Sequence, residues 1–307
     1  MGNIVLTGDR PTGKLHLGHL VGSIQNRVKL QNENNTNFYM VADVQALTDN
    51  ADNPQKVRDN VLEVVIDNMA CGLDPKKTTF FIQSRVPEIA ELTILFLNLV
   101  TLARLKRNPT VKDEMKQKGF GEDVPAGFLM YPVSQAADIL AFKANVVPVG
   151  EDQLPMIEQA NEIVQKFNSL YGETFKKITA EVPECPRCVG IDGLGKMSKS
   201  LNNAIYLSDS PEVIREKVMK MYTDPDHIHA KDPGKVEGNV VFMYLDIFDG
   251  DREELKKLKE HYKKGGLGDV EIKKRLAEIL IENTNEIRKN REKLEKDPEA
   301  ILNSFPS

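Results

Sequence analysis

Short apolar runs alternate with amphipathic stretches over the first two thirds of the chain. The apolar runs are typical of strands buried on both faces, and they fall at residues 4–6, 38–42, 79–82 and 145–149. Between them, apolar residues recur at helical spacing over residues 17–30, 57–69, 89–105, 131–142 and 154–167. Strands that alternate with helices predict an α/β fold with a doubly wound parallel sheet.

The pattern changes twice. Residues 108–127 are polar and contain glycine, which predicts a long surface loop of the kind that often acts as a lid or binding element. From about residue 208 the chain reads as wholly helical, with charged outer faces. We therefore predict a Rossmann-like domain at 1–205 and a smaller all-helical domain at 206–307, and we see no internal repeat.

Composition narrows the class of protein. The 307 residues are 40% hydrophobic, and no 18-residue apolar run is present, so we expect no membrane span. The net charge is −5 and the chain has no basic tail, so we expect no DNA partner. Three cysteines are too few for a disulfide framework and favour a reducing, cytoplasmic setting. Cys185 and Cys188 have a metal-like spacing but no nearby further ligand, so we expect free thiols and no protein-bound metal.

A glycine-rich turn follows the first predicted strand. Gly8 and Gly13 flank this turn, and His16 and His19 then lie on one side of the first turn of a helix. A helix N-terminus with added imidazole donors suits phosphate, and Gly18 leaves room for a flat ring. The alternative is an ordinary strand–turn–helix with two incidental histidines.

A second candidate segment is Lys196-Met197-Ser198-Lys199-Ser200, in a glycine-flanked loop. Two lysines three residues apart, between small serines, could form a mobile cationic clamp; the alternative is a solvated basic turn. HLGH near the start with KMSKS far downstream resembles the two signature motifs of class I aminoacyl-tRNA synthetases.

Two further polar groups lie where a pocket is expected. Tyr131, Gln135 and Asp138 share one face of an otherwise apolar helix, which indicates a pocket wall or, alternatively, a solvated stripe. Residues 150–153 follow a predicted strand at its carboxyl end, where ligands bind in such sheets, although the acidic pair there could simply cap a helix.

Taken together, four stretches make the chain resemble bacterial tryptophanyl-tRNA synthetases from about residue 3 to residue 300. They are GDRPTGKLHLGHLVGS at 8–23, YPVSQAADIL at 131–140, VPVGEDQ at 147–153 and GKMSKS at 195–200. The resemblance implies that Asp138 reads the indole and that tryptophan is bound by Asp138, Tyr131, Gln135, Gln153, Leu6 and Gly8. It implies an ATP site formed by Arg10, Thr12, His16, Gly18, His19, Lys112, Asp152, Lys196, Met197, Ser198 and Lys199. His16, His19, Lys196 and Lys199 would act in catalysis.

The same resemblance implies a reaction and its partners. Tryptophan and ATP, the latter with magnesium, would form tryptophanyl-adenylate, and tryptophan would then pass to the 2′-hydroxyl of the terminal adenosine of tRNA(Trp), on a cytoplasmic homodimer. In the family the helical domain usually continues beyond Ser307, and residues 251–307 lack the cysteines that bind an iron–sulfur cluster in some relatives. Tyrosyl-tRNA synthetase, a simpler nucleotidyltransferase and a non-charging regulatory paralogue are the alternatives.

Overall fold

The chain divides into two compact units that do not follow the predicted boundary near residue 205. A computed structural model describes residues 2–121, 123–183, 188–195, 197, 201–303 and 305. Unit 1 comprises Met1–Gly13, Ser23–Pro183 and Lys296–Ser307, and unit 2 comprises Lys14–Gly22 and Glu184–Glu295. Both signature motifs therefore belong to unit 2, while the predicted tryptophan-binding residues belong to unit 1. The functional division into a catalytic and a tRNA-binding domain stays a prediction.

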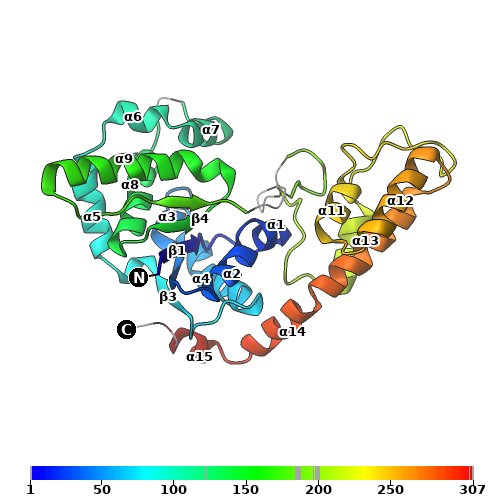
Figure 1. Ribbon diagram of the computed structural model, residues 1–307, viewed down its shortest axis with the longest axis horizontal. Coiled ribbons are helices and arrows are strands. Elements are labelled where there is room, and N and C mark those ends of the chain that lie inside the picture. The colour runs from blue at the N-terminus through cyan, green and yellow to red at the C-terminus, as the bar shows by residue number, and fades with distance from the viewer. Residues whose placement is uncertain are drawn as a thin grey trace. The chain divides into compact units, whose positions relative to one another are not determined.

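Unit 1 is built on a five-stranded parallel sheet in the order β3-β2-β1-β4-β5 (Figure 1). Its strands are β1 (Ile4–Asp9), β2 (Thr36–Val41), β3 (Thr78–Ile82), β4 (Val146–Pro148) and β5 (Thr179–Glu181). The chain first builds outward from β1 through β2 to β3, and then returns to β1 on its other side with β4. This reversal of strand order confirms the predicted doubly wound sheet, in which ligands bind at the carboxyl ends of the strands beside the reversal.

Helices cover both faces of this sheet (Figure 1). In unit 1 they are α2 (Gln25–Gln31), α3 (Asp43–Ala46), α4 (Pro54–Ala70), α5 (Glu88–Leu97), α6 (Leu102–Arg107), α7 (Pro109–Gln117), α8 (Ala126–Ala141), α9 (Leu154–Tyr171) and α15 (Pro298–Asn303), with short 3₁₀ turns η2 (Gln83–Arg85) and η3 (Glu151–Gln153). Leu6, Met40 and Phe81 share a buried cluster with residues of α5, α8 and α9. The neighbouring Val5 packs with Leu30 of α2 instead, as the two-residue period of a strand requires.

Three expected boundaries in unit 1 were wrong. The helix expected over 89–105 is two helices, because the chain leaves α5 at Asn98 and Thr101 then caps α6. The expected loop at 108–127 contains α7, whose N-cap Asn108 accepts a hydrogen bond from the Thr110 amide at 3.0 Å. Helix α8 begins at Ala126 rather than near Tyr131 and carries Pro132 in its interior, at the cost of one backbone hydrogen bond.

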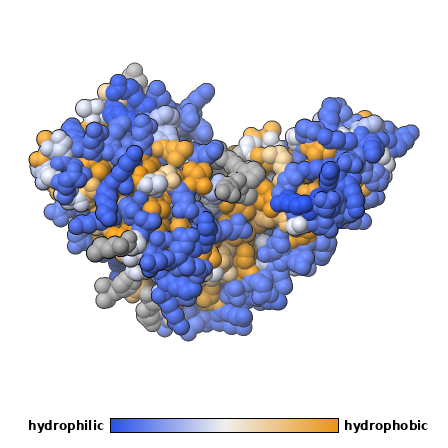
Figure 2. Space-filling view, viewed as in Figure 1, coloured by the Kyte–Doolittle hydropathy of each residue, from blue (hydrophilic) through white to orange (hydrophobic). Residues whose placement is uncertain are grey.

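Unit 2 is predominantly helical. It contains α1 (Leu17–His19), α10 (Pro211–Met219), α11 (Val240–Phe248), α12 (Arg252–Lys264), α13 (Asp269–Asn283) and α14 (Asn285–Leu294); a π-helical turn η1 (Leu20–Ile24) continues from α1 across the boundary to α2. Helix α13 packs against α10 and α11. The single helix expected over 269–294 breaks at Thr284, whose hydroxyl donates to the Leu280 carbonyl at 2.6 Å. The outer surface over α12 and α14 is mostly hydrophilic (Figure 2).

None of the helices in the described part of the chain is both long enough and apolar enough to span a bilayer.

Candidate functional site

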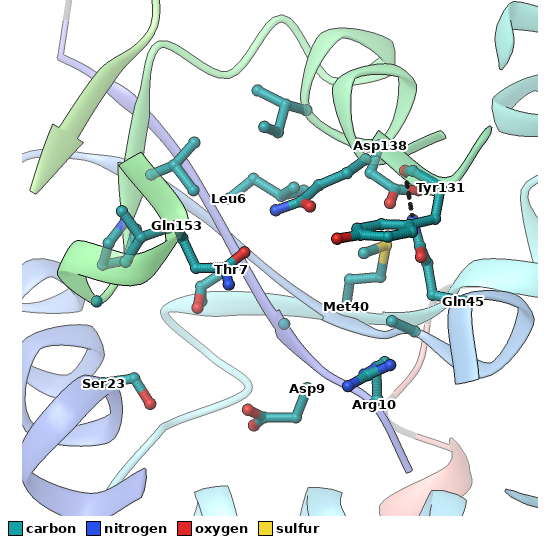
Figure 3. A pocket seen from close by; sticks show the side chains of 18 of the residues that line it. Leu6, Thr7, Asp9, Arg10, Ser23, Met40, Gln45, Tyr131, Asp138 and Gln153 are labelled. Carbon is teal, nitrogen blue, oxygen red and sulfur yellow. Dashed lines mark hydrogen bonds between the residues drawn. The ribbon is translucent and has the colours of Figure 1, made fainter. Parts of the chain in front are cut away.

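A cavity of about 330 Å³ opens at the carboxyl ends of β1 and β4 in unit 1. Residues Leu6 to Arg10 form one side of it, Val147 to Gly150 and Gln153 form a second side, and α8 closes a third with Tyr131, Gln135 and Asp138 (Figure 3). This is the point at which the strand order reverses, where the fold is expected to bind its ligand. The volume lies at the lower end of the range for small-molecule pockets.

Asp138 is the acidic group of this cavity and is only 1% exposed. Its Oδ1 atom accepts a hydrogen bond from Nε2 of Gln83 at 2.7 Å, whereas Oδ2 is buried without a hydrogen-bond partner among the described residues. Burial raises the pKa of Asp138 to about 7, and the hydrogen bonds from Gln83 and Gln45 only partly oppose this rise. A buried acceptor without a partner is costly, so this oxygen favours a ligand that brings an N–H or O–H donor.

Two glutamines that the sequence analysis missed hold this arrangement in place. The backbone N–H of Gln45 donates to Oε1 of Gln83 at 3.0 Å, which fixes the orientation of the Gln83 side chain toward Asp138. Nε2 of Gln45 reaches the Tyr131 carbonyl at 3.4 Å. Gln83 follows directly after β3, so the rule that polar residues at strand ends line ligand sites would have found it.

Tyr131 brings a phenol to the same cavity from α8 (Figure 3). Burial raises the pKa of Tyr131 well above its ordinary value, and the carboxylate of Glu114 on α7 adds to the rise. The hydroxyl is therefore protonated throughout the physiological pH range and can donate a hydrogen bond. Glu114 itself lines the cavity, although the sequence analysis placed it in a loop without a role.

A buried ion pair supports the β1 side of the cavity. Arg27 of α2 contacts Asp9 through Nη1 at 2.5 Å and Nη2 at 2.9 Å, and Nη2 also donates to the Gly8 carbonyl at 3.3 Å. Asn68 and the Tyr39 hydroxyl donate to the same carboxylate. A Cβ atom on Gly8 would lie 2.5 Å from the Met40 carbonyl oxygen, so this strand can pass β2 only with glycine there. Together these contacts fix the strand end from which Gly8 faces the cavity.

In unit 2 the first signature motif is anchored to the segment that follows the second. Residues 15–17 pair with 205–207, through the Leu17 amide to the Ile205 carbonyl at 3.0 Å and the Leu207 amide to the Leu15 carbonyl at 3.0 Å. The imidazole rings of His16 and His19 lie 3.9 Å apart between centroids.

Gly18 of the HLGH motif lies close to Met197 of the KMSKS motif. A Cβ atom there would lie 3.0 Å from the His16 ring and 3.7 Å from Cβ of Met197, so the ring of His16 occupies the space that the missing side chain leaves. Met197 is buried, and its amide donates to the Cys188 carbonyl at 3.3 Å. Within unit 2, HLGH therefore lies close to Met197, the described residue of KMSKS, and the shared nucleotide site stays a prediction.

The residues singled out from the sequence fall into four groups. Those that line the cavity are Leu6, Gly8, Arg10, Tyr131, Gln135, Asp138 and Gln153. Thr12, Lys112 and Asp152 belong to unit 1 but not to the cavity lining. His16, Gly18, His19 and Met197 belong to unit 2, and Lys196, Ser198, Lys199 and Cys185 lie outside the described residues.

Comparisons with known proteins agree with one another. A family model described as tRNA synthetases class I (W and Y) matches residues 2–284. The tryptophan–tRNA ligase of Clostridium longisporum is 60% identical over 298 residues, which cover 96% of this chain and 87% of that protein. That of Streptococcus pneumoniae strain R6 is 55% identical over 307 residues, covering 98% and 90%. The structure of tryptophanyl-tRNA synthetase from Campylobacter jejuni, complexed with ADP and tryptophan, matches with a TM-score of 0.83 at 32% identity, covering 98% of this chain and 92% of that chain.

Proposed function

This chain belongs to the class I tRNA synthetases of the tryptophan and tyrosine group, and we propose that its cavity and two motifs join L-tryptophan to tRNA at the expense of ATP. The prediction of tryptophan over tyrosine is confirmed by tryptophan–tRNA ligases that are 55–60% identical to this chain over nearly its whole length.

The observation that carries the proposed site is the unpaired Oδ2 atom of Asp138. An indole has one polar group, the N–H of its ring, and a cavity for it needs apolar walls and one buried acceptor. Asp138 supplies that acceptor within a cavity that Leu6, Met40 and Ile139 also line. A ligand without a donor at this position would leave the oxygen unpaired, which is how such a site rejects apolar analogues.

In the first step the carboxylate of tryptophan attacks the α-phosphorus of ATP, forms the acyl–phosphate bond and releases pyrophosphate. The carboxylate is already ionised at neutral pH, so no residue has to remove a proton. The protein therefore contributes mainly by positioning the reactants and stabilising charge on the phosphates. We assign Tyr131, Gln135 and Gln153 to the ammonium group or the side chain of tryptophan, since all three line the cavity. Arg10 is a cation that lines the same cavity.

The two motifs of unit 2 are assigned to the nucleotide. His16 and His19 would donate to phosphate oxygens, and Lys196 and Lys199 would neutralise the β- and γ-phosphates as charge develops on the leaving pyrophosphate. The closeness of Gly18 to Met197 supports this pairing, because Met197 is the described residue of KMSKS and Gly18 lies between the two histidines in sequence. Thr12, Lys112 and Asp152 would complete the ATP site, and magnesium would enter with ATP, bridging phosphate oxygens.

In the second step the 2′-hydroxyl of the terminal adenosine of tRNA(Trp) attacks the carbonyl carbon of the adenylate, an ester bond forms, and the acyl–phosphate bond breaks to release AMP. We place the enzyme in the cytoplasm as a homodimer. We assign the dimer interface to exposed hydrophobic side chains on two helices of unit 1: Ile94 and Leu95 of α5 and Leu102 of α6 are 60%, 55% and 67% exposed.

Aminoacylation of purified tRNA tests the proposal. The protein should attach radiolabelled tryptophan to tRNA in the presence of ATP and magnesium, and should fail to attach tyrosine at the same concentration. Formation of tryptophanyl-adenylate without any charged tRNA would instead point to the non-charging paralogue.

A further inference from the structure

Asp49 lies in the turn between α3 and α4 and joins two cations that come from separate elements. Its Oδ2 atom contacts Nη1 of Arg10 at 3.3 Å and Nζ of Lys118 at 2.9 Å. Its Oδ1 atom accepts from Nδ2 of Asn50 at 2.8 Å. Asp49 is 15% exposed at its side chain, against 48% for Arg10 and 32% for Lys118. The carboxylate is thus the most buried and the most firmly oriented member of the group.

Each cation connects Asp49 to a different wall of the tryptophan cavity. Arg10 follows β1 and lines the cavity itself. Lys118 directly follows α7, the helix from which Glu114 lines the cavity. A guanidinium has five donors, and the contact with Asp49 engages one nitrogen, so Arg10 can bind an anion while it remains paired with Asp49.

Helix α7 is held at both ends. At its start, the buried Asn108 donates to Oε1 of Gln159 at 2.9 Å, and the Thr110 hydroxyl donates to the Asp152 carbonyl at 2.9 Å. Beyond its end, Phe120 packs edge-on against Phe128 of α8, and the ion pair between Lys118 and Asp49 ties it to the turn before α4. Only one residue of α7 itself, Val111, is buried, so these end contacts rather than an apolar face keep the helix over the cavity.

We propose that Asp49 is a positioning residue for amino-acid activation. It fixes Arg10, which lines the cavity, in the orientation that receives the carboxylate of tryptophan, a role different from the ATP contact that the family resemblance implies for Arg10. It also closes α7 over the same cavity through Lys118. The inference rests on the proposed function, since it concerns the geometry of the first step. Asp49 touches neither substrate nor reacting atoms and acts through the two cations. Because a tilted carboxylate misses the line of attack on phosphorus, a loose Arg10 lowers the rate of the step more than the affinity for tryptophan.

Tryptophan-dependent exchange of pyrophosphate into ATP tests this assignment with Asp49→Asn. The amide keeps the size of the side chain but carries no charge to hold two cations. We expect kcat to fall about tenfold with the tryptophan KM changed less than threefold, and we expect backbone amides of residues 109–121 to exchange faster with solvent. Asp49→Glu, which keeps the charge, should stay within about threefold of the unaltered enzyme.

Two controls separate positioning from stability. Glu162→Gln removes the ion pair between Glu162 and Arg104, which lies in the same unit but outside the cavity lining. This variant should leave the rate of pyrophosphate exchange unchanged. Surface ion pairs contribute little to stability, so the melting temperature of Asp49→Asn should also stay within a few degrees of the starting value. Lys118→Met should reproduce the faster amide exchange, and combining it with Asp49→Asn should slow kcat no further than Asp49→Asn alone.

The outcomes distinguish this inference from the function on which it rests. If the unaltered protein shows no tryptophan-dependent exchange, the proposed function fails. If the unaltered protein does show this exchange, three results would each contradict the positioning role of Asp49. The kcat of Asp49→Asn could lie within twofold of that of the unaltered protein, or activity could fall only as far as the melting temperature falls. The reductions in kcat caused by Asp49→Asn and Lys118→Met could also multiply in the double variant.

Discussion

Nε2 of Gln83 lies 2.7 Å from Oδ1 of Asp138 and leaves the second oxygen of that buried carboxylate for a ligand. The hydrogen bond does two things at once. It gives one oxygen of this buried carboxyl group an internal partner, and it leaves the other oxygen without one among the described residues. Oδ2 is therefore the acceptor that we assign to the indole N–H of tryptophan.

Replacing Asp138 with alanine should weaken the binding of tryptophan by ~2–3 kcal/mol, or roughly 30- to 150-fold in the dissociation constant, because the indole N–H would lose its buried acceptor. The tryptophan KM in pyrophosphate exchange reports the loss, and the ATP KM should change little. A tryptophan KM equal to that of the unaltered enzyme would remove Asp138 from the site.

The affinity for tryptophan should rise with pH across neutrality. Burial raises the pKa of Asp138 to about 7, so in the free enzyme the carboxyl is mostly protonated at pH 6 and mostly ionised at pH 8. An ionised oxygen is the stronger acceptor for the indole N–H, so the dissociation constant should fall as pH increases through 7.

Calorimetric titration with tryptophan at pH 6, 7 and 8 measures this trend. Asp138→Asn is the control, since an amide keeps an acceptor oxygen without titrating, and its dissociation constant should be flat over the same range. An unaltered enzyme whose affinity is equally flat would show that Asp138 does not titrate there.

Gly18→Ala should impair the chemical step while sparing tryptophan binding. The new Cβ would lie 3.0 Å from the His16 ring, which would have to shift from the position that we propose for binding phosphate. We expect kcat for exchange to drop about tenfold with the tryptophan KM unchanged. Gly22→Ala is the matched control, because no heavy atom lies within 4 Å of a Cβ there. Equal kcat values for the two variants would argue against a catalytic place for His16.

Leu95→Glu should convert a dimer into monomers. A charge in the middle of an apolar contact surface is strongly unfavourable, whereas the same change at an exposed side chain outside the interface costs little. Sedimentation equilibrium of the variant gives the mass directly, with Leu170→Glu on α9, also exposed, for comparison. A monomeric unaltered protein, or a Leu95→Glu variant that still dimerises, would place the interface elsewhere.

Much of the fold could be predicted because local signals and global packing agree. The pair Asn53-Pro54 predicted the start of α4, and Asn53 does accept from the Lys56 amide at 3.2 Å with proline at the first helical position. Asn108-Pro109 carries the same signal for α7, but that helix has a single buried residue and so lacks the apolar periodicity that would have outweighed its polar composition. Strand β5 has only three residues, too few for its alternation to stand out.

The candidate site could be predicted only where residues are close in sequence. Tyr131, Gln135 and Asp138 share one helix, so their spacing predicts a common face. The pairing of Asp9 with Arg27, of Gln83 with Asp138 and of Asp49 with Lys118 depends on how separate elements meet. Charged residues such as Arg27 are normally read as exposed, and only the tertiary structure shows that four hydrogen bonds to three residues compensate its burial.

Pyrophosphate exchange into ATP, measured with each of the twenty amino acids in turn, tests the central claim most directly. The account predicts exchange with tryptophan, at least a hundredfold less with tyrosine, and none above background with phenylalanine, which has no donor for the Asp138 acceptor. Exchange that tyrosine supports as well as tryptophan, or exchange with no amino acid at all, would contradict it.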